Sequence, residues 1–121
     1  MIDHVSLEVS DLERSARFYD AVFFAVGVRR LAGSDRAIAY GIDHRSFWIT
    51  HGARTGVPGG HVAISARGRA AVDAAHDAGL GAGGSDDGAP GPRPQHGRRY
   101  YAGYLRDPDG QRVEIVTGSG G

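Results

Sequence analysis

Hydrophobic and polar positions alternate along two similar stretches of the chain. The opening Asp3-His4-Val5-Ser6-Leu7-Glu8-Val9 and the later Gly60-His61-Val62-Ala63-Ile64-Ser65-Ala66 both place an apolar residue at every second position. This period of two is typical of a half-buried β-strand. A histidine leads each run, and His4 and His61 are 57 positions apart. The two runs therefore predict equivalent strands with equivalent polar faces.

An amphipathic segment follows each of these strands. In residues 12–26, apolar side chains recur at three- and four-residue spacing, which predicts a helix with one buried face, formed by Leu12, Ala16, Tyr19, Phe23 and Val26. Ser10-Asp11-Leu12-Glu13 matches a capping box with Ser10 as the N-cap, and Gly27 suits the left-handed residue that ends a helix. Residues 69–80 repeat the amphipathic pattern, so the sequence predicts a duplicated module.

The remaining elements complete two modules of the form β-α-β-β-β. In module one, extended stretches at 28–31, 36–42 and 46–50 are separated by turn residues. In module two, the strand at 60–66 and the helix at 69–80 precede a short edge strand within 81–88 and strands at 99–106 and 111–117. Asp107-Pro108-Asp109-Gly110 is a strong turn signal between the last two. We expect a single α+β domain over 1–121, with module one at about 1–53, a linker at 54–59, module two at about 60–117 and a frayed tail at 118–121.

The amino-acid composition argues against nucleic-acid and membrane partners. The 121 residues contain 14 basic and 14 acidic side chains and no cysteine. A chain with no net charge has no field that would recruit nucleic acid or an anionic membrane, and no apolar run approaches the length of a membrane span. No signal peptide precedes the first strand. We therefore expect a cytoplasmic protein with a small-molecule partner, and neither a nucleic-acid nor a membrane partner.

Several of these motifs together resemble the vicinal oxygen chelate (VOC) superfamily. The resemblance rests on His4-Val5-Ser6-Leu7, on Gly60-His61-Val62-Ala63-Ile64-Ser65, and on Asp107-Pro108-Asp109-Gly110 leading to Val113-Glu114-Ile115. The superfamily includes glyoxalase I, bleomycin resistance proteins, fosfomycin resistance proteins and extradiol dioxygenases. Membership implies paired β-α-β-β-β modules that form a curved mixed sheet around a cavity. It also implies metal ligands on the cavity face of the first and last strand of each module.

The resemblance implies a metal site formed by His4, His61 and Glu114. The two histidines are related by the duplication, and alternation along the last strand separates Glu114 from Val113 and Ile115. Two imidazoles and one carboxylate leave metal positions open for water or substrate and suit Fe, Mn, Zn, Ni or Co as a divalent ion. Glu114 is also the expected catalytic residue. The alternative is that the histidines are surface or hydrogen-bonded residues, as most strand histidines are.

Trp48 stands where module one would offer the counterpart of Glu114. Glyoxalase I and its close relatives carry a fourth metal ligand at that position, and an indole cannot ligate a metal. Members of the superfamily that bind their metal through three protein ligands therefore match this sequence better. Trp48 is expected either to form an aromatic wall of the cavity or to fill the core.

Further substrate contacts are expected from module two. By alternation Tyr100 and Tyr104 share one strand face and Tyr101 takes the other, and one of these sets is expected to line the cavity. The proline-rich segment 90–99 is expected to form a loop beside the mouth of the cavity, with Arg93 and His96 as candidate contacts. The other histidines are assigned to surface or turn positions, namely His44, His51 and His76.

The expected function is that of a metal-dependent glyoxalase-like enzyme, of lyase or isomerase type, acting on a small oxygen-bearing substrate chelated to the ion. One alternative is an extradiol-type Fe(II) dioxygenase. The other is a metal-free, bleomycin-resistance-like protein that binds an antibiotic. Because modules in this superfamily pair within or between chains, we also expect a homodimer whose sites are shared between chains.

Overall fold

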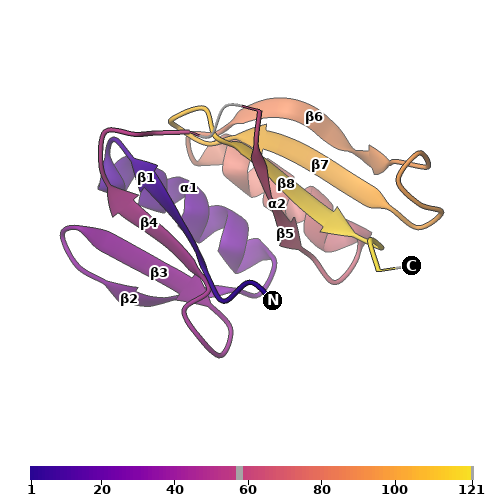
Figure 1. The fold of residues 1–121 in the computed structure, drawn as a ribbon. Coiled ribbons are helices and arrows are strands. Elements are labelled where there is room, and N and C mark those ends of the chain that lie inside the picture. The colour runs from indigo at the N-terminus through magenta and orange to yellow at the C-terminus, as the bar shows by residue number, and fades with distance from the viewer. Residues whose placement is uncertain (57–58, 121) are drawn as a thin grey trace.

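The computed structural model describes residues 1–56 and 59–120, which form two β-α-β-β-β modules (Figure 1). Module one consists of β1 (Val5–Val9), α1 (Leu12–Ala25), β2 (Arg29–Gly33), β3 (Ala37–Gly41) and β4 (Phe47–His51). Module two consists of β5 (His61–Ser65), α2 (Arg69–Gly81), β6 (Ser85–Pro92), β7 (Tyr101–Arg106) and β8 (Arg112–Thr117). The predicted α+β class and the duplicated order of elements are confirmed.

Each module has its own four-stranded sheet with the same topology. The strand order is β1-β4-β3-β2 in the first sheet and β5-β8-β7-β6 in the second. In both, the first strand of the module pairs in parallel with the last, and the other pairs are antiparallel. The two sheets are open, and both helices lie on one side of them (Figure 1). Within the described residues, neither helix has the length and apolar character needed to cross a membrane.

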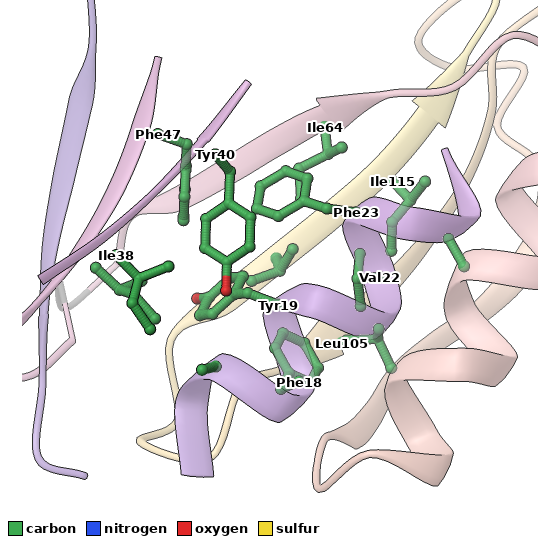
Figure 2. Close-up of a cluster of buried hydrophobic side chains, with 14 of the residues drawn as sticks. Phe18, Tyr19, Val22, Phe23, Ile38, Tyr40, Phe47, Ile64, Leu105 and Ile115 are labelled. Carbon is green, nitrogen blue, oxygen red and sulfur yellow. The ribbon is translucent and has the colours of Figure 1, made fainter. Parts of the chain in front are cut away.

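One hydrophobic cluster joins the two modules on the helix side of the sheets. Side chains of α1 fill its centre, where Phe23 lies with its ring centroid 4.9 Å from that of Tyr40 and 5.1 Å from that of Phe47 (Figure 2). Module two contributes Leu105 and Ile115 among others to the same cluster. The cluster occupies the space between the helices and the sheets, so the opposite faces of the sheets are free of core packing.

The turn between β7 and β8 connects module two to the start of α1. Asp11, not Ser10, is the N-cap of α1, and its side chain accepts a hydrogen bond from the Arg14 amide at 3.0 Å. The prediction that Ser10 caps this helix was wrong because its hydroxyl and amide instead donate to Asp109, at 2.5 and 3.0 Å. Tyr19 donates to the neighbouring Asp107 at 2.6 Å. Burial raises the pKa of Asp107 above its ordinary value.

Two predicted boundaries change. β6 runs on to Pro92, so part of the segment expected to be a loop is an edge strand, where proline is tolerated because one side of the strand has no partner. Gly118 was expected to be frayed, but it is half-buried and has a φ of 77°. A Cβ there would clash with the backbone oxygen of Arg99. Of the expected linker 54–59, residues 57 and 58 lie outside the described residues, as does Gly121 of the tail.

Candidate functional site

β8 turns its side chains alternately toward the helices and away from them. Val113 and Ile115 belong to the core, so Glu114 between them lies on the face of the sheet that points away from α2. His61 reaches the same face, because β5 pairs with β8 so that His61 lies opposite Arg112, two residues before Glu114. We call this the outer face of the second sheet; its central side chains are His61, Tyr100, Tyr104, Arg112 and Glu114.

The Glu114 carboxylate is buried although it lies on the outer face. Its side chain is 3% exposed, whereas that of His61 is 43% exposed. Nε2 of His61 lies 3.0 Å from Oε1 of Glu114. The hydroxyl groups of Tyr100 and Tyr104 donate to Oε2, at 2.5 and 3.4 Å. Such partners offset the cost of removing a carboxylate from water.

Of the two tyrosine sets expected to line either the cavity or the core, Tyr100 and Tyr104 lie on the outer face with Glu114, and Tyr101 does not. Tyr101 points toward α2, where its hydroxyl donates to Asp73 at 2.6 Å. The hydrogen bond from Tyr100 to Glu114 raises the pKa of Tyr100 to about 12. Burial raises the pKa of Tyr104 as well. Both hydroxyl groups therefore remain protonated and able to donate at neutral pH.

A pocket of about 370 Å³ adjoins this cluster. Its lining includes Asp87, Arg93, Gln95, His96, Tyr104 and Arg112. The Arg93 guanidinium carbon lies 5.5 Å from the centroid of the Tyr104 ring. The His96 ring centroid lies 5.1 Å from that of Tyr100. The structure thus brings the expected contacts Arg93 and His96 beside the two tyrosines that hold Glu114.

Two charged residues of this pocket, Arg112 and Asp87, were not predicted as contacts. Arg112 lies with its guanidinium carbon 4.2 Å from the Tyr104 ring centroid and donates through Nε to Asp87 at 2.9 Å. Arg112 had a signal in the sequence, since alternation along the last strand puts it on the same face as Glu114. The sequence held no signal for Asp87, because a register shift between Asp86 and Gly88 determines where its side chain points.

Module one presents a different outer face. Ser6 pairs with Trp48 on the neighbouring strand, just as Ala63 pairs with Glu114, so Trp48 occupies the position equivalent to Glu114. Trp48 is half-buried and lies outside the hydrophobic cluster, which removes the expectation that it fills the core. Its indole is available as an aromatic wall. His4 precedes β1, and its Nδ1 lies 2.8 Å from Oδ1 of Asp3.

The described chain brings His61 and Glu114 together but does not bring His4 to them. Within residues 1–56 and 59–120, no group of three or more histidine, cysteine or acidic side chains could hold a metal ion. His44 and His51 are exposed, as expected. The surface assignment of His76 was wrong: it is 6% exposed, and its Nε2 lies 3.0 Å from Asp86 and 3.1 Å from the Tyr104 carbonyl oxygen.

Comparison with known proteins identifies the family. Residues 1–115 match the model of the Glyoxalase/Bleomycin resistance protein/Dioxygenase superfamily. The chain therefore belongs to this superfamily, as its motifs and its paired modules indicated. No protein of curated function matches the sequence.

Solved structures of similar fold agree with this assignment. A glyoxalase/bleomycin resistance protein from Albidiferax ferrireducens is 32% identical, with 94% of this chain and 96% of that one covered and a TM-score of 0.85. A glyoxalase-related enzyme from Fulvimarina pelagi is 26% identical, with coverages of 96% and 86% and a TM-score of 0.75. A glyoxalase I variant from Zea mays is 27% identical, with a TM-score of 0.67; the match covers 93% of this chain but 45% of the maize chain.

Proposed function

We propose that this chain is a metal-assisted enzyme, of lyase or isomerase type, that acts on a small oxygen-bearing molecule. The observation that carries the proposal is the 3.0 Å separation of His61 Nε2 and Glu114 Oε1 on the outer face of the second sheet. Two ligands that share one metal ion at bond lengths of about 2.1 Å, and at a right angle, are roughly 3 Å apart. The donor pair therefore fits a shared divalent ion as well as it fits a direct hydrogen bond.

The third ligand in this proposal is His4 of a second copy of the chain. Its side chain is 54% exposed. The contact between Nδ1 and Asp3 leaves Nε2 as the free ring nitrogen. Histidines that bind metals commonly use their other nitrogen in this way, because the carboxylate fixes the tautomer and orients the ring. A homodimer would bring module one of one chain to module two of the other and complete a set of two imidazoles and one carboxylate.

The roles of the protein side chains follow from their contacts. A divalent ion held here would supply Lewis-acid polarisation of substrate oxygen atoms. In this proposal Glu114 would accept a proton from the substrate. Tyr100 and Tyr104 contact its Oε2 and would hold its orientation. Trp48 from module one would close the cavity with an aromatic surface.

Metal content tests the proposal. Elemental analysis of protein purified without chelators should find near one transition-metal equivalent per chain, lost in His4→Ala, His61→Ala and Glu114→Ala. The control is His51→Ala, which removes an exposed histidine of β4 and should retain the metal. Metal retained by Glu114→Ala would overturn the site. Iron, rather than zinc or nickel, would favour dioxygenase chemistry over isomerisation.

Mixing two inactive variants tests whether the site is shared between chains. A heterodimer of His4→Ala and Glu114→Ala keeps one complete site if His4 acts across the interface, and no complete site if all three ligands come from one chain. Recovery of metal binding after mixing supports the shared site. A protein that stays monomeric at all concentrations in sedimentation contradicts it.

A metal-free binding protein is the second candidate. Two observations favour it: protein donors already contact both oxygens of Glu114, and Trp48 is half-buried outside the core. Absence of metal even after reconstitution, together with quenching of Trp48 fluorescence by a planar antibiotic, would support this reading over the enzyme.

A further inference from the structure

The pocket beside Glu114 contains hydrogen-bond donors that other described residues do not use. Arg112 donates through Nε to Asp87. Within residues 1–56 and 59–120, its two terminal nitrogens make no hydrogen bond. The side chains of Gln95 and His96 are exposed and likewise make no hydrogen bond to the described part of the chain. Three side chains therefore present free donors around one hollow.

The charge of this pocket is positive. Asp87 is its acidic residue, and that carboxylate lies 2.9 Å from Nε of Arg112 and 3.2 Å from Nε of Arg106. Arg93 is held by neutral groups, because its Nη2 donates to the carbonyl oxygens of Ala89 and Ala102 at 2.7 and 3.2 Å. The lining thus holds one carboxylate and two guanidinium groups, those of Arg93 and Arg112. A concave positive surface of this kind attracts anions.

We propose that this pocket binds an oxyanion group, a carboxylate or a phosphate, of the substrate whose reacting end reaches Glu114. The link to Glu114 rests on the proposed function; the anion site itself does not. The Arg112 guanidinium lies over the Tyr104 ring, which fixes its plane, and its terminal nitrogens form the planar fork that suits oxyanions. Tyr104 connects the two sites: its ring contacts the Arg112 guanidinium, and its hydroxyl contacts the Glu114 carboxylate.

Titration of the metal-free full-length protein tests the site. Inorganic phosphate and acetate are added separately, with neutral acetamide as the control for carbonyl binding. NMR follows the Nε–Hε signal of Arg112 in the unmodified protein and, in every variant, the backbone amide signal of Gly88, which also lines the pocket. Both anions should shift these signals saturably, and acetamide should not. Arg112→Ala should weaken phosphate binding about tenfold or more, the loss of one charge-assisted hydrogen bond.

Arg36→Ala is the matched control, because Arg36 is an exposed arginine between β2 and β3 and does not line the pocket. It should bind phosphate within about twofold of the unmodified protein. A double variant, Gln95→Ala with His96→Ala, changes two exposed side chains. It should weaken phosphate binding by about fivefold or more, the loss of two hydrogen bonds, and it provides the test if Arg112→Ala does not fold.

The outcomes separate this inference from the proposed function. Equal phosphate binding by Arg112→Ala and the unmodified protein would overturn the anion site, as would a matching shift with acetamide. Phosphate binding that depends on Arg112 in a protein that takes up no metal would leave the anion site standing and refute the metal enzyme. Metal binding without phosphate binding would support the metal enzyme and refute the anion site.

Discussion

Trp48 and Glu114 occupy equivalent positions in the two halves of the duplicated fold. Trp48 pairs with Ser6, and Glu114 pairs with Ala63, which follows Ser6 by the same 57 residues that separate the two leading histidines. One half therefore presents an aromatic surface where the other presents a buried carboxylate. The duplication supplies the scaffold twice, and the chemistry of the two outer faces has diverged.

The hydrogen bond between Tyr100 and Glu114 predicts an effect on tyrosine titration. The bond to the carboxylate raises the pKa of Tyr100 to about 12, so Glu114→Gln should lower it toward the ordinary value near 10. Because the pKa is higher in the folded state, stability from this bond is complete below pH of about 10 and lost as pH rises through about 12. Ultraviolet titration, with Tyr100→Phe to assign the transition, measures the shift. Glu8→Gln is the control, and a Glu114→Gln curve that superimposes on the native curve would contradict the contact.

Gly79 in α2 packs directly against core side chains. A Cβ there would lie 2.5 Å from Leu105 Cδ1 and 3.0 Å from Val22 Cγ2. Gly79→Ala should therefore lower the free energy of unfolding by about 1–3 kcal/mol through overpacking, despite the better helix propensity of alanine. At Gly81, two residues on in the same helix, a Cβ meets no atom within 4 Å of it. Urea denaturation should find Gly81→Ala neutral or slightly more stable, and equal effects at both sites would refute the packing argument.

Asp109 links the β7–β8 turn to the start of α1. Its carboxylate accepts hydrogen bonds from the Ser10 amide and hydroxyl and from Arg14 Nη2, the last at 3.4 Å. Asp109→Ala leaves these donors without their partner and should cost about 1–3 kcal/mol of unfolding free energy. Asp77→Ala, which removes an exposed carboxylate of α2, should change stability by less than about 0.5 kcal/mol. The idea fails if both variants have the same denaturation midpoint.

Tyr19 supports the buried Asp107 in a pH-dependent way. Burial raises the pKa of Asp107, whereas the Tyr19 hydroxyl favours the ionised carboxylate and lowers that pKa. A bond that lowers the folded-state pKa stabilises above it and is lost as pH falls through it. Tyr19→Phe should therefore destabilise by about 1–2 kcal/mol at neutral pH, with the difference shrinking on acidification. Chemical denaturation at several pH values measures this. Tyr101→Phe, whose hydroxyl contacts the exposed Asp73, should cost less; a difference independent of pH would refute the coupling.

Local patterns in the sequence predicted the order of helices and strands. They also predicted the strand faces of His61 and Glu114, two of the three expected metal ligands. Alternation of period two assigns each strand residue to a face, and the 57-residue offset relates the two modules. Alternation puts His61 and Glu114 each on the polar face of its strand, and the family resemblance implied that both belong to one site; the structure has them 3.0 Å apart. The same alternation separated Tyr101 from Tyr100 and Tyr104, but it could not choose which side was the outer one. The role of His4 stays a prediction.

Contacts between segments that are distant in sequence were decided only by the tertiary structure. Ser10 matched a helix cap, yet it donates to a carboxylate 99 residues away, because that turn packs against the start of α1. His76 looked like a surface histidine, yet it is buried where α2 meets β6 and β7. Asp87 acquired its place beside Arg112 from a register shift in an edge strand. Local periodicity determines which way a side chain points, whereas its partners depend on how whole elements pack, and that is fixed by the shared core between the modules.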